Sequence, residues 1–479
     1  MYLKKHLNNG MLNDDNPRVT LDRRKYLKGL GVGAVAGLAG CSGTGGGSGG
    51  GTEGGTSGSG GGGGGSTSTE GSGGESTSEW QYDGTIDKAF VSPDNIENDI
   101  WQAFLAGARE AASALDLSVD YQTHGGQESQ QMSQLQAAIT GGADMITGTA
   151  YQNSGVRSIA DVAAEGGVPF ISYWTMATWW TPLDTGPEFL QYQIPEVVRT
   201  GAATARVLFE AMGGSGNFVH ITGVPGHVGS HRNAGVELAM EEYPDIERLG
   251  EPIPSEWTRA TGRQAMSDFI SKFGEDIDGV YGQNDGVALG ALSVLEENDM
   301  AVPVVGYDGF QESVGLVRDR SGDSGQPWLA GTFAAQPFWQ GGWAVVKGYD
   351  WLHGWRPEVP ERMMFGGGAM IINDSLSRDT FGDMDVSFTS PQRYLDVAFS
   401  EGESPYDWQA MSVEESGDEW DPQNLLSPIR REDFSQLLWT EENKPSNYSV
   451  PSEYDNADLF DQVEQDYRER FENGANPYA

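Results

Sequence analysis

The chain has 479 residues, of which 70 are acidic and 29 are basic, and its formal net charge is −41 at pH 7. Nucleic-acid binding needs a basic face that neutralises phosphates, so this composition argues against nucleic acid as a partner. Cys41 is the single cysteine, so the sequence offers no disulfide and no thiolate metal cluster. So large an acidic excess repels itself unless salt screens it, and at molar salt the screening length falls to about 3 Å. We therefore expect a protein from a halophilic organism.

The first 41 residues have the pattern of an export signal. Arg23 and Arg24 precede a short apolar stretch, residues 29–40, which is shorter than the roughly 20 apolar residues needed to cross a bilayer. This order of features predicts a twin-arginine signal. The stretch ends in Leu-Ala-Gly-Cys and resembles a lipobox, in which the cysteine is acylated and becomes the mature N-terminus. We therefore expect a lipid on Cys41.

Residues 42–79 contain only Gly, Ser, Thr and Glu. Such a segment cannot bury a core, and as a flexible coil it would span roughly 35 Å. With a lipid on Cys41, it would tether a folded body to the outer face of the cytoplasmic membrane. One acyl chain binds membranes only marginally, so firm anchoring would need further lipid or contacts.

Between residues 84 and 365, short apolar runs alternate with segments of helical periodicity. The predicted strands are residues 85–91, 143–147, 168–173, 217–222, 279–281, 302–307 and 331–334. The predicted helices are residues 99–114, 154–165, 195–212, 230–242, 264–273, 287–298 and 338–352. This alternation predicts an α/β protein with parallel sheets. One open sheet rarely takes so many units, so we expect two lobes.

Residues 373–479 form an acidic extension in which the periodicity weakens. Helices are predicted at residues 425–438 and 457–471, within a partly ordered segment to which the sequence assigns no role. Asn373 and Asn447 each begin a triplet that fits the glycosylation acceptor pattern.

Two neighbouring segments carry the strongest motif. Residues 281–292 have the sequence Tyr-Gly-Gln-Asn-Asp-Gly-Val-Ala-Leu-Gly-Ala-Leu, which predicts a strand, a polar turn and a helix. Residues 304–309, Val-Val-Gly-Tyr-Asp-Gly, predict another strand that ends in an aromatic residue and a carboxylate, Asp308. In this arrangement Asp285 can cap the helix while Asn284 points outward from the end of the strand. Ligands of open α/β sheets bind at such carboxyl ends.

These segments resemble the ligand-binding segments of type I periplasmic binding proteins, the sugar receptors of ABC importers such as the ribose- and xylose-binding proteins. The resemblance covers about residues 84–365. It implies an α/β fold with two Rossmann-like parallel-sheet lobes joined by a three-strand hinge. Residues 84–191 with 337–365 would form the N-terminal lobe, and residues 192–336 would form the C-terminal lobe.

The resemblance also implies which side chains contact the ligand. Residues 90–108 look like the family's first strand, binding loop and helix, residues 226–235 are similar to its glycine-rich turn, and residues 331–341 resemble its last hinge segment. The implied ligand contacts are Asn98, Trp101, Trp174, Arg232, Asn284, Tyr307, Asp308 and Gln336. The sequence departs from the family after Tyr173, where several sugar receptors have an Asp-Arg pair and this chain has Trp174-Thr175. The identity of the sugar therefore stays open.

This set of side chains suits a polyol. Its amide, carboxylate and guanidinium groups are planar forks that can hold two neighbouring hydroxyls at once. Its aromatic rings can cover the apolar faces of a sugar. An analogue that lacks one hydroxyl would leave a buried group unpaired, at a cost of about 1–3 kcal/mol.

The function implied by the resemblance is that of an extracytoplasmic lipoprotein that captures a small sugar between its lobes and delivers it to an ABC permease. The chain would cross between the lobes near residues 191–194, near residue 336 and after about residue 365. Ligand contacts with both lobes would drive a hinge closure. The expected partners are the sugar, the permease and the membrane, with no cofactor, no metal and no catalytic residue.

Two other functions stay open at this point. A sugar-sensing receptor that presents its ligand to a signalling protein would have the same anchor and cleft. A secreted carbohydrate-active enzyme would need two carboxyl groups roughly 5–10 Å apart across one bond, and the sequence offers Asp308 without an evident partner.

Each candidate residue also has a structural alternative. Asn284 and Asp285 can serve as helix caps, and Asp308 can shape a turn before Gly309. Arg232 can form a surface ion pair with Glu237. Three loop tryptophans can pack against the extension, namely Trp174, Trp179 and Trp180. A metal pair of His227 and His231 lacks a third ligand.

Overall fold

The computed structural model describes residues 85–96, 99–224, 228–377, 386–399, 404–475 and 477–478. The predicted export signal, lipobox and tether lie outside these ranges, as do Asn98 and His227. Among the helices that the structure describes, none combines the length and the apolar character that crossing a bilayer requires.

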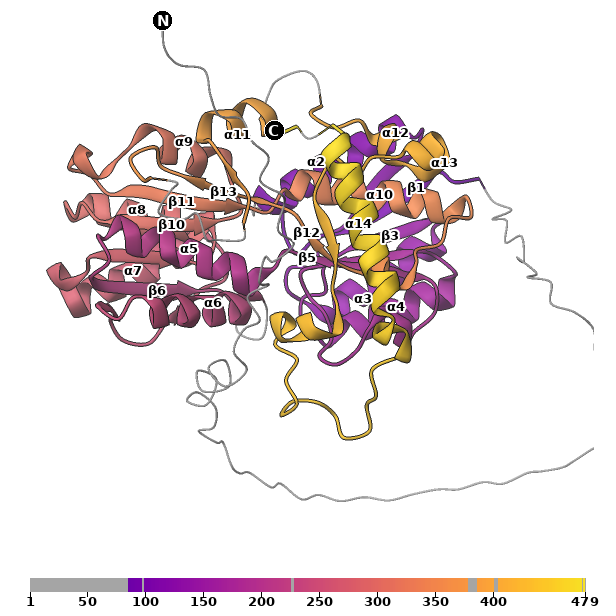
Figure 1. Ribbon diagram of the computed structural model, residues 1–479, viewed down its shortest axis with the longest axis horizontal. Coiled ribbons are helices and arrows are strands. Elements are labelled where there is room, and N and C mark those ends of the chain that lie inside the picture. Colours follow the sequence, from indigo (N-terminus) through magenta and orange to yellow (C-terminus); the bar gives the residue numbers. More distant parts are fainter. Residues whose placement is uncertain are drawn as a thin grey trace, which may run out of the picture. The chain divides into compact units, whose positions relative to one another are not determined.

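The first lobe is built on a seven-stranded sheet (Figure 1). Its strands are β1 (Lys88–Ser92), β2 (Ser118–Tyr121), β3 (Met145–Gly148), β4 (Phe170–Tyr173), β5 (Phe189–Ile194), β12 (Met363–Gly366) and β15 (Leu426–Pro428). They lie in the order β15-β12-β5-β4-β3-β1-β2. Neighbouring strands are parallel except for β12 and β15, which are antiparallel.

The second lobe is built on an eight-stranded sheet. Its strands are β6 (Gly216–Thr222), β7 (Ile246–Arg248), β8 (Ile253–Pro254), β9 (Gly279–Gly282), β10 (Pro303–Tyr307), β11 (Trp328–Ala334), β13 (Ala369–Ile372) and β14 (Phe388–Thr389). The main path runs β14-β13-β11-β10-β9-β6-β7, and β8 also pairs with β6. Only β11 and β13 pair antiparallel.

Helices accompany both sheets. In the first lobe they are α2 (Asp99–Ala114), α3 (Glu128–Thr140), α4 (Gly155–Gly166) and α10 (Pro337–Leu352). In the second lobe they are α5 (Val197–Ala211), α6 (Val228–Glu242), α7 (Arg259–Phe273), α8 (Asp285–Glu297), α9 (Gln311–Asp319) and α11 (Pro391–Ala398). Further helices of the extension are α12 (Trp408–Met411), α13 (Val413–Ser416) and α14 (Ala457–Asn473). The short 3₁₀ helices are η1 (Pro182–Asp184), η2 (Gly274–Asp276), η3 (Gly322–Ser324), η4 (Val359–Arg362), η6 (Gly417–Glu419), η7 (Arg431–Leu437) and η8 (Ser452–Asp455).

The central strands are buried along their whole length because both faces of each sheet are covered. Every residue of β4, β5, β10 and β11 is buried, which is typical of strands in parallel sheets. Local signals also set the helix starts. The Thr258 hydroxyl accepts a hydrogen bond from the Thr261 amide at 3.2 Å and caps α7, and Pro337 occupies the first position of α10.

Three connections join the lobes. β5 of the first lobe leads into α5 of the second, β11 of the second leads into α10 of the first, and β12 of the first is followed by β13 of the second. Two parallel-sheet lobes with three crossings confirm the predicted fold class.

Among the elements that were not predicted from the sequence are β2 and α3, and both have weak apolar patterns. β2 is an edge strand whose residues are exposed or half-buried. In α3 only Gln131 and Leu135 are buried, so the helix has almost no apolar stripe.

The two helices predicted in the extension had different outcomes. The helix predicted at residues 457–471 is observed as α14, which packs against β15 (Figure 1). The prediction for residues 425–438 is wrong in its first half, which contains β15, whereas Arg431–Leu437 forms the 3₁₀ helix η7 and not an α-helix. Leu426 and Pro428 are buried where β15 pairs with β12, and a sheet partner distant in sequence overrides the local helical spacing.

The extension packs on the first lobe through a fully buried lysine. The Lys347 ammonium donates hydrogen bonds to Asp350 at 2.9 Å and to the Met411 carbonyl at 3.0 Å. It also lies 4.7 Å from the Trp343 ring and 4.3 Å from the Trp420 ring. A buried cation is tolerated when an anion and hydrogen bonds compensate it, and here both Met411 and Trp420 come from the extension.

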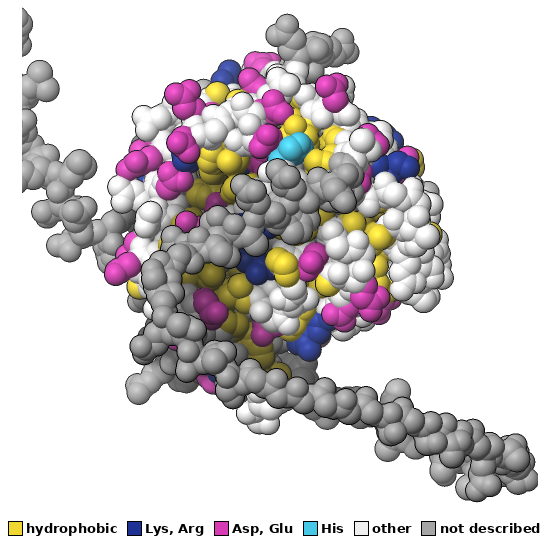
Figure 2. All heavy atoms as spheres, turned by 90° about the vertical axis from the view of Figure 1, so that its right-hand side faces the viewer, with side chains coloured by type: hydrophobic (Ala, Val, Ile, Leu, Met, Phe, Trp, Pro, Cys, Tyr) yellow, Lys and Arg dark blue, Asp and Glu magenta, His cyan; other side chains and the backbone are white. Residues whose placement is uncertain are grey.

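The surface is acidic where it can be seen. Figure 2 shows Asp and Glu side chains spread over the visible face, with few Lys and Arg side chains between them. This distribution agrees with the formal charge of −41.

Candidate functional site

The turn after β10 holds Asp308 in an unusual backbone conformation. Asp308 has a φ of 120° and is followed by Gly309 with a φ of 77°. The Asp308 amide donates to the Phe333 carbonyl at 2.7 Å. Its carboxyl group is buried, with 3% of the residue exposed. Positive φ in a non-glycine residue is costly and persists only where the surroundings enforce it.

Asp285 is the side chain that fixes this turn. Its carboxylate accepts hydrogen bonds from the Phe310 amide and from the Thr332 hydroxyl, each at 2.7 Å. Asp285 is fully buried, and its two partners follow β10 and lie within β11. Asp285 therefore links the start of α8 to the Asp308 turn and acts as an anchor for that turn.

Asn284 caps α8 and also touches Asp308. Its side-chain oxygen accepts a hydrogen bond from the Val287 amide at 2.8 Å, and its amide group donates to the Trp257 carbonyl at 3.0 Å. A hydrogen bond from Asn284 also lowers the pKa of Asp308. Asn284 thus has the helix-cap role that the sequence allowed, and it also contacts the carboxyl group of Asp308, a candidate ligand-binding residue.

Arg232 on α6 is buried among aromatic rings. Its guanidinium carbon lies 3.6 Å from the centroid of the Tyr307 ring, 5.3 Å from that of Trp257 and 5.9 Å from that of Trp174. Trp174 follows β4 of the first lobe, whereas the other two rings belong to the second lobe. The arginine therefore contacts rings from both lobes.

Arg232 and Asp308 lie together as a buried pair, which is an ion pair when the Asp308 carboxyl group is charged. The Arg232 Nη2 atom lies 3.7 Å from Asp308 Oδ1, and Arg232 Nη1 donates to the Gln283 carbonyl. Within the part of the chain that the structure describes, Arg232 Nε and Asp308 Oδ1 have no hydrogen-bond partner. Buried polar atoms are nearly always hydrogen-bonded, so these two are candidates for pairing with a ligand.

Burial raises the pKa of Asp308 to about 8. The positive charge of Arg232 opposes this rise, while the negative charges of Asp285 and Asp99 add to it. Because Asp99 begins α2 in the first lobe, charges of both lobes act on this carboxyl group. Burial also raises the pKa of Asp285 to about 6, against its hydrogen bonds from the Asp308 turn.

The other predicted residues have separate settings. Asn98 lies outside the described residues. Trp101 is buried on α2 and packs edge-on against Phe104, with ring centroids 5.5 Å apart. Gln336 is buried at the second connection with a φ of 54°, and among the described residues its side-chain oxygen has no hydrogen-bond partner.

The structure brings together five of the predicted contacts. Around the buried ion pair lie Trp174, Arg232, Asn284, Tyr307 and Asp308. The Tyr307 hydroxyl is held by the Thr200 hydroxyl at 2.9 Å. The surface alternative for Arg232 does not apply, because Glu237 pairs with Arg248 instead.

Trp179 illustrates the structural alternative for an aromatic loop residue. Its indole N–H donates to the Thr440 carbonyl at 3.0 Å and to Asn443 Oδ1 at 2.7 Å. Its ring packs against Trp439 and Phe434 of the extension. Trp179 is therefore a packing residue between the first lobe and the extension.

Sequence reasoning missed Trp257 as a neighbour of Arg232. It has a φ of 64° and lies just before α7, and its ring covers Gly223 so closely that a Cβ there would collide with it. The only signal in the sequence was an isolated aromatic residue between a strand and a helix, which has many structural uses.

A second polar cluster lies at the carboxyl edge of the first sheet. His124, which follows β2, is fully buried with its Nδ1 atom 3.6 Å from Asp94 Oδ1. Burial lowers the pKa of His124, and the Asp94 charge opposes this. No group of three His, Cys, Asp or Glu side chains within the described ranges is arranged to hold a metal ion.

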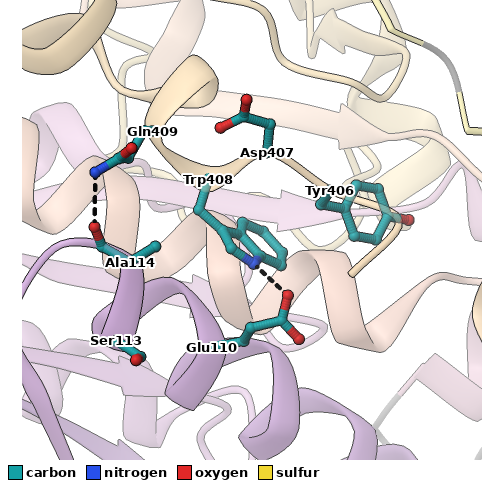
Figure 3. Close-up of a pocket in the computed structure, with 7 residues that line it drawn as sticks. All are labelled: Glu110, Ser113, Ala114, Tyr406, Asp407, Trp408 and Gln409. Atoms are coloured by element: carbon teal, nitrogen blue, oxygen red, sulfur yellow. Dashed lines mark hydrogen bonds between the residues drawn. The ribbon is translucent and has the colours of Figure 1, made fainter. Parts of the chain in front are cut away.

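A surface hollow of about 480 Å³ lies between α2 and the extension (Figure 3). In it the Trp408 indole N–H donates to Glu110 at 3.0 Å, and the Gln409 amide donates to the Ala114 carbonyl at 3.0 Å. None of its lining residues is a predicted ligand contact. The buried ion pair therefore remains the candidate site because of its chemistry.

A family model described as a periplasmic binding protein domain matches residues 89–354. The xylitol-binding protein of Mycolicibacterium smegmatis is 31% identical over 214 residues, which are 44% of this chain and 58% of that protein. The chain thus spans less than two thirds of the length of this relative.

Solved structures show the same fold. A twin-arginine translocation pathway signal protein from Burkholderia phytofirmans has a TM-score of 0.56 and 24% identity, covering 63% of this chain and 95% of its own. An ABC transporter solute-binding protein from Mycobacterium smegmatis with bound glycerol has a TM-score of 0.52 and 22% identity. The match covers 63% of this chain and 98% of that protein.

Proposed function

Because the chain belongs to the periplasmic binding protein family, whose members are extracytoplasmic solute receptors and not enzymes, we propose that it binds a small polyol or sugar at the Arg232–Asp308 pair. The observation that carries this proposal is a buried ion pair enclosed by aromatic rings from both lobes, in which Arg232 Nε and Asp308 Oδ1 lack a hydrogen-bond partner among the described residues. Neighbouring hydroxyl groups of a polyol can supply both a donor for the carboxylate oxygen and an acceptor for the guanidinium N–H.

The comparisons favour a neutral polyhydroxylated ligand. One relative is named for xylitol and one structural neighbour holds glycerol, both of which are acyclic polyols. In this chain Trp174 takes the place of the Asp-Arg pair that follows the same strand in several sugar receptors, so the first lobe offers a flat ring to the ligand. We therefore place sugar alcohols first among the candidates and monosaccharides second.

The binding experiment is a thermal-shift screen at high salt, followed by calorimetry. The probes are xylitol, ribitol, glycerol, ribose and xylose. A ligand at 100 times its Kd stabilises the folded state by about 2.7 kcal/mol. We expect stabilisation by at least one polyol, its loss in Asp308→Ala, and an unchanged response in Asp268→Ala, which removes an exposed carboxylate of the same lobe. A ligand that stabilises wild type and Asp308→Ala equally would contradict the assigned site.

We propose further that the receptor is an exported lipoprotein that passes its ligand to an ABC permease. Arg23 and Arg24 would direct twin-arginine export, and Cys41 would carry the lipid. Uptake of labelled ligand by cells that lack this chain should be restored by wild type and not by Asp308→Ala. If wild type and Asp308→Ala restore uptake equally, uptake does not depend on the proposed binding site.

A further inference from the structure

Three tyrosines of the segment that follows the family domain lie in one continuous contact. The Tyr406 hydroxyl donates to the Tyr478 hydroxyl at 3.3 Å. The Tyr478 ring stacks on the Tyr394 ring, with centroids 5.4 Å apart and 19° between the ring planes. Tyr394, Tyr406 and Tyr478 are called the tyrosine stack below, and all three lie beyond the matched residues 89–354.

One end of the tyrosine stack belongs to the first lobe. The Tyr406 ring packs on Phe338 and Trp408, with centroids 6.1 Å and 5.2 Å away. Phe338 lies in the first turn of α10, two residues after Gln336. Trp408 is held to α2 by its hydrogen bond to Glu110 (Figure 3).

The other end belongs to the second lobe and reaches the candidate site. Tyr394 is buried on α11, which packs against α9 and β13. A Cβ built on Gly309 would lie 3.0 Å from Tyr394 Oη, so the tyrosine hydroxyl lies against the residue that follows Asp308. Burial is the main cause of the raised pKa of Tyr394, and the negative charges of Asp285 and Asp308 add to it, which agrees with this proximity. The Arg393 guanidinium also donates to the Pro477 carbonyl at 2.7 Å.

We propose that the tyrosine stack is a positioning device for ligand binding: Tyr394 holds the Asp308 turn in place, and Tyr478 and Tyr406 tie that turn to the first lobe. This inference rests on the proposed function for its biological meaning. Chain connections alone leave the lobes of a hinge protein free to move. A non-covalent contact across the lobes lowers the free energy of the arrangement in which Arg232 meets Trp174, and so favours the state that binds.

The first test measures ligand affinity in two variants of Tyr478, a half-buried residue of the last described segment. Tyr478→Ala removes the stacked ring, and from the usual strength of an aromatic pair we expect about 3- to 10-fold weaker binding of the polyol found in the screen. Tyr478→Phe keeps the ring and should bind within about twofold of wild type. The matched control is Tyr448→Ala, which removes a tyrosine of the extension that contacts Asp184 and Trp179 of the first lobe. Its affinity should equal that of wild type.

The second test needs no ligand. The unfolding free energy is measured against pH for proteins with and without the Asp308→Asn substitution, in the wild-type and Tyr478→Ala backgrounds. In each background, the effect of Asp308→Asn on the unfolding free energy stops changing with pH above the folded-state pKa of Asp308. Burial is the main cause of the raised pKa of Asp308, so a loosened turn that admits water should lower this upper pH limit. The charged groups that face Asp308 are Arg232, Asp285 and Asp99, and all three are unchanged in both backgrounds.

The outcomes separate the two proposals. An unchanged upper pH limit in the Tyr478→Ala background would overturn the positioning role. A loss of affinity in Tyr448→Ala as large as that in Tyr478→Ala would overturn it as well. If wild type binds none of the polyols, the proposed function fails. A lower upper pH limit in the Tyr478→Ala background would still support the positioning of Asp308 by the tyrosine stack.

Discussion

Replacing Asp308 by Asn should separate the stability of this protein from its affinity for ligand. The unfolded chain loses the Asp308 proton near its ordinary pKa of 3.8, whereas the folded protein keeps it until about pH 8. A raised folded pKa means that the stabilising contribution is complete below pH 4 and is lost as the pH rises through 8. Each pH unit in this window removes about 1.4 kcal/mol, on the order of 5 kcal/mol in total.

The Asn variant mimics the protonated carboxyl group at every pH. Its unfolding free energy should therefore lack this decline, and the difference between the variant and wild type should grow between pH 4 and pH 8. Ligand binding should respond in the opposite sense. Hydroxyl groups that donate to a carboxylate favour its charged form, so wild-type affinity should rise by about tenfold or more between pH 6 and pH 8. The variant should bind about 10- to 100-fold more weakly at pH 8, because it loses a hydrogen bond to a charged group.

Chemical denaturation and calorimetry at pH 5, 7 and 9 in high salt would measure both effects. Asp268→Asn serves as the control, since this carboxylate is exposed on α7 of the same lobe. If the difference in unfolding free energy between wild type and Asp308→Asn stays constant with pH, then Asp308 titrates normally and the electrostatic account of the site is wrong. If affinity is independent of pH while the stability difference depends on pH, the ligand does not donate a hydrogen bond to the Asp308 carboxylate.

Three further results are expected. Gly223→Ala should displace the Trp257 ring from Arg232 and weaken ligand binding, and calorimetry that shows wild-type affinity in a folded variant would contradict the role of that ring. Cys41→Ser should move the exported protein from the membrane fraction to the soluble fraction, and continued sedimentation with membranes would argue for another anchor. The thermal midpoint should rise steeply between 0.1 M and 2 M KCl because salt screens a net charge of −41, and a flat response would argue against adaptation to high salt.

The sequence determined the features that are local or repeated. Apolar runs such as residues 302–307 predicted the parallel strands, because a strand covered on both faces must be apolar throughout. The polar residues after two of these runs predicted Asn284 and Asp308 at the carboxyl edge of the second sheet, and the structure places them in contact. The acidic excess and the leader pattern are likewise properties of composition and order alone.

Tertiary structure decided what depends on distant partners. The segment at residues 425–438 has helical spacing, yet Leu426 and Pro428 pair with β12 because a free sheet edge there satisfies their backbone. Neither Trp257 against Arg232 nor Tyr478 against Tyr394 has a local signature, since each contact joins elements far apart in the chain. The raised pKa of Asp308 arises in the same way, because burial and the charges that surround it exist only once both lobes are folded.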